Sequence, residues 1–259
     1  MRAYSKIAVS HDGPVCRITL NAPERRNAIG PVMVNELLHA LSDARDEAAV
    51  RVVVLTGSGK AFCAGGDFQQ MTAGGDVAEL PFKGDYADLL LAMTQFDKPV
   101  VARVNGAAMG GGLGLVAASA FAIAQSDAAL GTPEINVGLF PMMIMAVLVR
   151  VVPRRKLLEM MLTGDRLTAD EALAAGLVNR VVAPDALDAA VDSLVAKLAS
   201  KSPKTLALGL NAFAAQDDLD LAAALPMLRA RLAECLATDD AREGLMAFVE
   251  KRTPVWTGK

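Results

Sequence analysis

The stretch "GGGLGL" at residues 110–115 decides the fold of this chain. It lies between the strand-like run "PVVARVNG" (99–106) and the apolar run "VAASAFAIA" (116–124), so backbone with almost no side chains leads into a helix. Glycine-rich backbone at the start of a helix exposes peptide N–H groups at the positive end of the helix dipole. Such groups can bind a phosphate, a carboxylate or an oxyanion that develops during a reaction. Other features of the sequence indicate which of these three ligands is expected.

The composition indicates a folded protein that acts on a small molecule. The chain has 259 residues, of which 53% are hydrophobic and 21% charged, enough for one large or two modest domains with a sizeable core. Its net charge is −3, and it contains no block of five or more basic residues. Proteins that bind nucleic acid or an anionic membrane usually carry such a basic patch. The expected partner is therefore a small molecule, and neither nucleic acid nor a membrane.

The cysteines and histidines favour a reducing compartment, which we predict to be the cytoplasm, and no metal site. Cys16, Cys63 and Cys235 are scattered and show no CxxC spacing, which fits neither a disulfide framework nor a zinc site. His11 and His39 do not suggest a metal-binding pair. The first residues lack the apolar stretch of a signal peptide.

Residues 104–126 carry no charge and are long enough to span a bilayer. Five glycines and several polar residues in this stretch argue against a membrane helix, because glycine costs about 1 kcal/mol per helical position. We therefore predict no membrane-spanning segment.

The first half of the chain alternates strands and helices. Residues 6–21 predict a hairpin that turns at Asp12-Gly13, with Cys16, Ile18 and Leu20 on one face. The segments that follow are predicted as a helix over 31–48, a strand over 50–58, a helix over 85–96, a strand over 98–106, the helix opened by the glycine run, and a short strand over 121–124. This order predicts an α/β fold with repeated strand–strand–helix turns.

Helices dominate the second half. Apolar or periodic segments at 141–152, 155–164 and 168–176 precede one strand-like run at 177–184, and three long helical stretches follow up to Arg252. Thr168 and Glu171 predict a capping box, and Pro203 and Pro226 punctuate the later helices. We place a boundary near residue 195, between a core over 1–195 and a helical region over 196–259. The apolar residues of that region need a surface to cover, and another subunit could supply it.

Two weak signals support a phosphate ligand for the glycine run. The segment "GSGKA" (57–61) resembles the end of a P-loop, but Val54 stands where the first glycine belongs and Ala61 where Ser or Thr would reach magnesium. Gly112-x-Gly114-x-x-Ala117 fits a dinucleotide-binding pattern, but the preceding strand ends too early and no acidic residue follows at the required distance. A nucleotide cofactor is therefore not favoured.

A second glycine-rich loop favours the oxyanion. The loop "KAFCAGGDF" (60–68) follows its strand as "NGAAMGGG" (105–112) follows the next. Paired N–H groups, one from each loop, would stabilise the negative charge that forms when a thioester is enolised or attacked. The alternative is that both loops need glycine only for packing at the start of a helix.

Four motifs follow one another along the chain: "GSGKAFCAGGDF" (57–68), "VNGAAMGGGLGLVAASAFAIA" (104–124), "GTPEINVGLFP" (131–141) and "LTGDRLTADEALAAGLVNRVV" (162–182). In this order and spacing they resemble the crotonase (enoyl-CoA hydratase/isomerase) superfamily, and the likeness extends from "PERRNAI" (23–29) to "FVEKR" (248–252). The resemblance implies a spiral of ββα turns with a C-terminal helical region that forms a homotrimer or a dimer of trimers. It also implies an acyl-CoA thioester as substrate, with coenzyme A entering as part of that substrate and no separate cofactor.

The resemblance implies an oxyanion hole made by the backbone N–H groups of Gly66 and Gly111. It implies that Glu134, in "TPEI", acts as an acid or base. Hydratases of this superfamily use a second glutamate to activate water, and Gly114 stands at that position here. A further difference follows Pro141, where "MMIMA" replaces a glycine-rich helix start, so methionine could line the acyl pocket or pack in the core.

The resemblance also implies a coenzyme A site. Arg25 and Arg26 stand where phosphate contacts are made, the backbone of Cys63 and Ala64 would meet the adenine, and Lys251 would reach coenzyme A, in its own or a neighbouring subunit. The alternative for these basic residues is an exposed, solvated surface. No base partner for a Cys63 nucleophile is recognisable.

Asp67 follows the second glycine of its loop, where it could bind substrate or cap the loop. Should a second carboxylate be needed for hydration, Asp67 and Asp85 are the first candidates, although their spacing places neither beside Glu134.

Three functions remain open. A single carboxylate suffices for a 1,3-proton shift, which favours an isomerase that converts 3-enoyl-CoA to 2-enoyl-CoA. Hydration of 2-enoyl-CoA is the second possibility, because fold and motif do not fix the reaction. The third is a non-catalytic protein that binds acyl-CoA.

Overall fold

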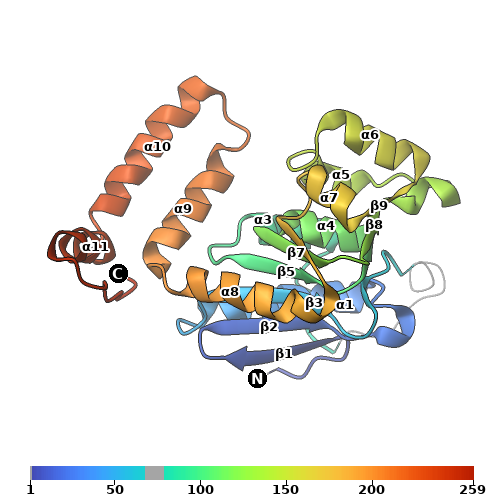
Figure 1. Cartoon of the computed structure of the whole chain (residues 1–259), viewed down its shortest axis with the longest axis horizontal. Coiled ribbons are helices and arrows are strands. Elements are labelled where there is room, and N and C mark those ends of the chain that lie inside the picture. The colour runs from blue at the N-terminus through green and yellow to red at the C-terminus, as the bar shows by residue number, and fades with distance from the viewer. Residues whose placement is uncertain (1, 68–78) are drawn as a thin grey trace.

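The computed structural model describes residues 2–67 and 79–259, and its strands form two sheets (Figure 1). The larger sheet contains, in spatial order, β1 (Ile7–Asp12), β2 (Val15–Leu20), β3 (Val52–Gly57), β5 (Val100–Val104), β7 (Phe121–Gln125) and β10 (Arg180–Val182). The smaller sheet contains β4 (Ala61–Cys63), β6 (Ala107–Met109), β8 (Ala129–Gly131) and β9 (Arg166–Thr168). The β1–β2 and β8–β9 pairs are antiparallel and the others parallel.

The sheets are built by a repeated unit. Each of β3, β5 and β7 runs in the larger sheet, and the strand that follows it, β4, β6 or β8, runs in the smaller one. The predicted strand–strand–helix repeat is therefore confirmed. The strands of the smaller sheet were not predicted as separate elements, because three residues are too few to show an alternating pattern.

Helices cover the sheets and connect the strands. The helices of the core are α1 (Pro31–Asp46), α3 (Tyr86–Thr94), α4 (Gly111–Ala118), α5 (Met142–Leu148), α6 (Arg154–Thr163), α7 (Ala169–Ala174) and α8 (Leu187–Ala199), with short 3-10 helices η1 (Pro23–Arg25), η2 (Pro133–Val137) and η3 (Pro184–Ala186). The Thr168–Glu171 capping box at the start of α7 is confirmed. So is the hairpin of β1 and β2, in which Cys16, Ile18 and Leu20 are buried.

The stretch over 104–126 does not form one long helix. It contains the end of β5, then β6, α4 and β7. Across residues 2–67 and 79–259, every helix is too short or too polar to cross a bilayer.

The larger sheet is packed between two apolar clusters. One cluster lies between this sheet and the helices α1, α3 and α4. The other joins α8 to the opposite face, and its buried members are Val52, Val54, Val101, Ile123, Leu187, Val191 and Val195. Residue 195, where we placed a boundary, therefore lies within a helix that belongs to the core.

Beyond α8 the chain forms a helical arm, made of α9 (Pro203–Gln216), α10 (Leu221–Leu236) and α11 (Asp239–Glu250), which extends away from the sheets (Figure 1). Four helices, α8 to α11, thus replace the three long stretches expected after Asp185. Pro203 begins α9 as expected, whereas Pro226 lies inside α10 and does not end it. Asp240 is fully buried in the arm, where its carboxylate accepts hydrogen bonds from Ser202 Oγ and from the backbone of Thr257 and Gly258.

Asn27 fixes the loop that leads into the site. It is fully buried, its Oδ1 accepts a hydrogen bond from Ala22 N, and its Nδ2 lies 2.9 Å from the carbonyl oxygens of both Ser58 and Ala61. Its φ of 57° is in the left-handed region, which asparagine tolerates better than most residues. One side chain therefore connects η1 to both ends of the β3–β4 turn.

We expect Asn27→Ala to lower the free energy of unfolding by about 2–4 kcal/mol, because it leaves buried donors and acceptors without a partner. Urea denaturation measures this change. Asn21→Ala is the matched control, since Asn21 is exposed on the same segment and its replacement is expected to change stability little. Equal stability of the two variants would contradict the role of Asn27.

Candidate active site

The two glycine-rich loops lie against each other. A methyl carbon built on Gly65 would lie 3.3 Å from the carbonyl oxygen of Met109, and one built on Gly110 would lie 3.6 Å from Gly65 Cα. A methyl on Gly112 would come within 2.5 Å of Cys63 Cβ. Both Gly65 and Gly110 have positive φ angles, of 106° and 50°. Glycine is required here by close approach as well as by backbone conformation.

The N–H groups of Gly66 and Gly111 have no protein acceptor in the described part of the chain. Gly111 is the first residue of α4, where a helix leaves N–H groups unbonded. Both residues are only partly buried, and a methyl carbon on Gly66 would meet no atom of residues 2–67 and 79–259 within 4 Å. Each loop therefore offers a partly exposed N–H donor, although the roles of the two donors stay a prediction.

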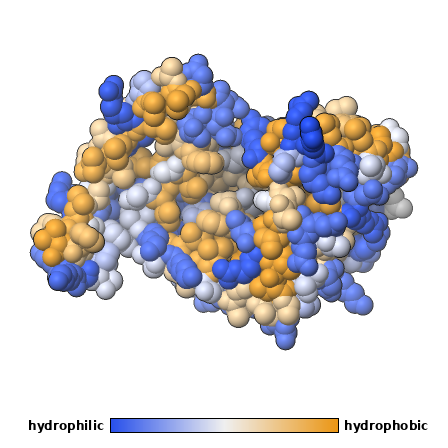
Figure 2. All heavy atoms as spheres, turned by 45° about the horizontal axis from the view of Figure 1, so that its top comes forward, coloured by the Kyte–Doolittle hydropathy of each residue, from blue (hydrophilic) through white to orange (hydrophobic). Residues whose placement is uncertain are grey.

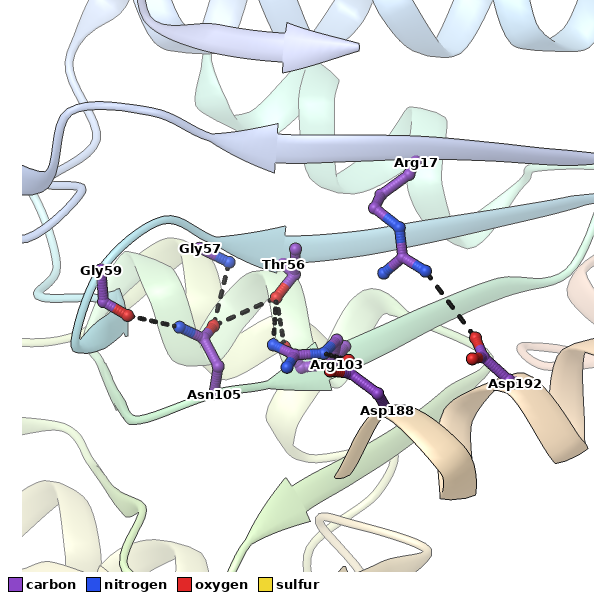
Figure 3. Close-up of polar contacts among 8 residues, drawn as sticks. All are labelled: Arg17, Thr56, Gly57, Gly59, Arg103, Asn105, Asp188 and Asp192. Atoms are coloured by element: carbon purple, nitrogen blue, oxygen red, sulfur yellow. Dashed lines mark hydrogen bonds and ion pairs between the residues drawn. The ribbon is translucent and has the colours of Figure 1, made fainter. Parts of the chain in front are cut away.

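Asn105 holds the turn behind these loops (Figure 3). Its Oδ1 accepts hydrogen bonds from Gly57 N and Thr56 Oγ1, at 3.0 and 3.1 Å, and its Nδ2 donates to the Gly59 carbonyl at 3.1 Å. The end of β5 is thereby connected to the turn between β3 and β4. Both glycine-rich loops therefore follow segments that Asn105 connects to each other.

Two ion pairs join the larger sheet to α8 (Figure 3). Arg103 Nε lies 2.7 Å from Asp188, and its Nη1 donates to Thr56 Oγ1 at 3.3 Å. Arg17 and Asp192 are 3.8 Å apart, and Arg17 is more exposed than Arg103. Exposed pairs of this kind stabilise a protein little, so the buried apolar contacts of α8 carry more of the stabilisation.

Glu134 lies beside the glycine run. It is in the first turn of η2, directly after β8, and a methyl on Gly110 would lie 2.7 Å from its Oε1. Its Oε2 is buried without a hydrogen-bond partner in the described part of the chain, as is Thr132 Oγ1. Burial raises the pKa of Glu134 above its usual range, and a backbone hydrogen bond partly offsets this. A carboxyl group of this kind is suited to accept and return a proton.

Tyr86 is a site residue that the sequence analysis missed. It begins α3, and its hydroxyl donates a hydrogen bond of 2.5 Å to the carbonyl oxygen of Gly111. A methyl on Gly114 would collide with this hydroxyl and come within 2.5 Å of Ile144 Cγ2. The space that a side chain at position 114 would need is therefore occupied. The signal in the sequence is weak, since Tyr86 is only one of two tyrosines in the chain.

Asp67 and Asp85 have structural roles. Asp67 is buried and forms an ion pair of 2.8 Å with Arg25. Asp85 caps α3, where its carboxylate accepts hydrogen bonds from Ala87 N and Asp88 N. Throughout residues 2–67 and 79–259, no group of three or more His, Cys, Asp or Glu side chains is placed to hold a metal ion.

The predicted coenzyme A residues of the core lie on neighbouring segments. Arg25 ends η1 and Arg26 follows it, and the Arg26 carbonyl accepts a hydrogen bond from Ala64 N. Arg26 is exposed and Ala64 partly so, whereas Cys63 is buried. Burial raises the pKa of the Cys63 thiol to about 12, which keeps it protonated at neutral pH.

This arrangement can be compared with known proteins. The sequence model of the enoyl-CoA hydratase/isomerase family matches residues 10–259. The chain belongs to this family. It is 34% identical over 242 residues to a Xenopus laevis protein, enoyl-CoA hydratase domain-containing protein 3, mitochondrial, which covers 93% of this chain and 82% of that protein.

Solved structures of the family have the same fold. The crystal structure of an enoyl-CoA hydratase from Mycobacterium smegmatis matches with a TM-score of 0.90 at 36% identity, covering 97% of this chain and 99% of the other. That of human enoyl Coenzyme A hydratase domain-containing protein 3 matches with a TM-score of 0.90 at 30% identity, covering 97% and 100%. The predicted α/β fold with its helical C-terminal region is confirmed. The cytoplasmic location stays a prediction, and the frog relative is named as mitochondrial.

Membership of the enoyl-CoA hydratase/isomerase family makes the chain an acyl-CoA enzyme. The position of the helical arm decides whether the predicted coenzyme A residue Lys251 lies near the glycine loops of its own subunit. Lys251 directly follows α11, which lies at the far end of the arm from α4 (Figure 1). Within one subunit, Lys251 is therefore not brought to the glycine loops. Contact with coenzyme A would have to involve a neighbouring subunit.

We expect replacement of both Arg25 and Arg26 by alanine to raise KM for an acyl-CoA more than it lowers kcat, because contacts remote from the reacting atoms act mainly in binding. Steady-state kinetics at two salt concentrations measures the effect. The control replaces Arg154 and Arg155, an exposed adjacent pair on α6, by alanine. A KM that both double variants leave unchanged would mean that Arg25 and Arg26 do not bind substrate.

Proposed function

We propose that this enzyme is an isomerase that converts 3-enoyl-CoA to 2-enoyl-CoA, with Glu134 as its single acid and base. The observation that carries the proposal is the lack of a carboxylate at position 114, where the family resemblance places the second glutamate of a hydratase. Gly114 offers no side chain, and the Tyr86 hydroxyl occupies the space beside it. Asp67 is paired with Arg25 and Asp85 caps a helix, so neither is placed to substitute.

The reaction moves one proton between two carbons. Glu134 removes a proton from C2 of the 3-enoyl-CoA, and the electron pair moves into the thioester carbonyl to give an extended enolate. The N–H groups of Gly66 and Gly111 stabilise the negative oxygen. Glu134 then returns the proton to C4, which leaves the double bond between C2 and C3. One carboxyl group suffices because the proton it gains is the proton it delivers.

The environment of Glu134 supports this role. A raised pKa makes the carboxylate a stronger base than an exposed glutamate. The unpartnered Oε2 leaves one oxygen available for a substrate proton. Substrate binding needs no metal or separate cofactor in this scheme, since coenzyme A is held by Arg25, Arg26 and the backbone at Cys63 and Ala64.

Hydration of 2-enoyl-CoA is the second candidate, because the Mycobacterium smegmatis neighbour is named an enoyl-CoA hydratase. In that reaction Glu134 alone would have to take a proton from water and a proton would have to reach C2. The product separates the two candidates, since hydration yields 3-hydroxyacyl-CoA.

We expect the wild-type enzyme to convert 3-enoyl-CoA to 2-enoyl-CoA, with little 3-hydroxyacyl-CoA, and Glu134→Gln to lower this rate by about 10²- to 10⁴-fold. The wild-type rate should fall as the pH falls through the raised pKa of Glu134, because protonation removes the base. Glu134→Gln should lack this acidic limb. Part of the transferred proton should come from the substrate when the reaction runs in D₂O.

The control is the dissociation constant of free coenzyme A, which Glu134→Gln should leave nearly unchanged. Efficient hydration of 2-enoyl-CoA by the wild-type enzyme would contradict the one-base proposal. Binding without any turnover would instead favour a non-catalytic acyl-CoA-binding protein.

We also propose that the arm mediates self-association into a trimer or a dimer of trimers. Large apolar side chains are exposed along it, and Figure 2 shows apolar atoms gathered over this part of the molecule. The most exposed are Phe248 at 83% and Val249 at 79%, both on α11. Apolar patches of this kind usually mark interfaces.

We expect replacement of Phe248 and Val249 by aspartate to shift the protein to a smaller species in size-exclusion chromatography with light scattering, because charges in an apolar contact are costly to bury. Phe82→Asp is the control, since Phe82 is equally exposed at 83% but lies outside the arm. An unchanged mass of the arm variant would contradict this interface.

A further inference from the structure

An oxyanion hole formed by glycine residues depends on flexible backbone that must be held in place. Stabilisation of a developing charge depends on donors that are already in position. Residues 110–112 are three consecutive glycines, whose backbone has more conformational freedom than any other and no side chains to restrain it. Contacts from elsewhere in the fold must hold this turn.

Backbone hydrogen bonds hold Gly110 on both sides. Its N–H donates to the Gly131 carbonyl at 2.9 Å, and its carbonyl accepts from Gly114 N at 3.1 Å. The first bond attaches the turn to the end of β8, and the second is the first hydrogen bond of α4. Gly111, which carries the proposed oxyanion donor, is one residue further along.

Tyr86 supplies the restraint on Gly111. Its hydroxyl donates to the Gly111 carbonyl, and its Cζ and Oη would both lie 3.5 Å from a methyl carbon on Gly111, which is ordinary contact. The tyrosine is itself well fixed, because it begins a capped helix that buries Leu89, Leu90 and Met93. The capped helix α3 therefore restrains Gly111, which has no side chain to restrain its backbone.

We propose that Tyr86 is a positioning residue of the oxyanion hole. The Gly111 N–H belongs to the peptide unit whose Gly110 carbonyl accepts from Gly114 N, and the Tyr86 hydroxyl holds the next peptide unit through the Gly111 carbonyl, so the two bonds together limit rotation at Gly111. The inference rests on the proposed function, in which that N–H binds the thioester oxygen. It gives α3, a segment distant in sequence from the glycine run, a role in holding that run in position.

The chemistry of the phenol suits positioning and excludes a role as base. Burial raises the pKa of Tyr86 well above its usual value, and the nearby Cys63 and Glu134 add to this. The hydroxyl therefore keeps its proton at neutral pH and acts as a donor to the carbonyl. It does not replace the missing carboxylate in proton transfer.

The test uses calorimetry to compare the binding of acetyl-CoA and of free coenzyme A, which lacks the acetyl group and with it the thioester carbonyl. Tyr86→Phe keeps the ring and removes the hydroxyl. We expect it to weaken acetyl-CoA binding by about 3- to 10-fold, the effect of one hydrogen bond, and to leave coenzyme A binding unchanged. We expect kcat for isomerisation to fall at least as much. Tyr4→Phe is the matched control, because the Tyr4 hydroxyl contacts Asp43 and not the site.

Gly114→Ala provides an independent perturbation, because its methyl would displace the Tyr86 hydroxyl. It should reduce acetyl-CoA binding in the wild-type background and have a smaller effect in the Tyr86→Phe background. If the losses of acetyl-CoA affinity caused by Gly114→Ala and Tyr86→Phe are additive in the double variant, the methyl acts through Ile144 instead, which would count against the inference.

The outcomes separate this inference from the proposed function. If Tyr86→Phe weakens both ligands equally, or neither, the positioning role is wrong even when the isomerase activity is present. If the wild-type enzyme shows no isomerisation but Tyr86→Phe selectively weakens acetyl-CoA, the proposed reaction fails and the positioning role stands. Equal binding of both ligands by the wild-type enzyme would overturn the oxyanion hole and the role of Tyr86 together.

Discussion

The close approach of Gly65 to Gly110 is the constraint on which the rest of the site depends. It brings together two loops that are 45 residues apart in the numbering of the chain, and a side chain at either position would meet the backbone or the Glu134 carboxylate opposite. The approach is possible because β4 and β6 pair in parallel directly before these loops, with Cys63 opposite Ala108. The residues that pair between the two strands, Ala61 with Ala107 and Cys63 with Ala108, are all small. Asn27 and Asn105 then hold the turns behind the loops, which prevents the glycines from relaxing apart.

Much of the fold could be predicted from the sequence because its signals are local. The alternation along β2, the capping box at Thr168, and the strand runs of β3 and β5 each lie within a few residues. The order of these elements predicts the repeat, and the family resemblance implies that Glu134 and the glycine loops act in one site. Three-residue strands give no periodic pattern, so β4, β6 and β8 are visible only in the structure.

The parts of the site that could not be predicted depend on contacts between distant segments. Tyr86 meets Gly111 across 25 residues of chain, and Asn27 meets Ala61 across 34. Neither residue stands in a spacing pattern with its partner. The boundary that we placed near residue 195 falls within α8 for a similar reason, because α8 and the arm are both amphipathic helices in the sequence. Only packing distinguishes α8, whose apolar face meets the sheet, from α11, whose large apolar side chains are exposed.

The relation between Gly114 and Tyr86 bears on the choice of reaction. Hydration requires two proton movements, one from water and one to carbon, and two carboxylates divide this work naturally. Here a neutral phenol fills the space at position 114, and it is engaged with the Gly111 carbonyl. In the proposed reaction, position 114 therefore supplies no group that moves protons, and Tyr86 is engaged with the backbone instead. If Glu134 is the one proton carrier, a reaction in which the same proton leaves and returns is the one that it can complete by itself. A glycine at 114 also leaves the room that Tyr86 needs, because a methyl carbon there would collide with its hydroxyl.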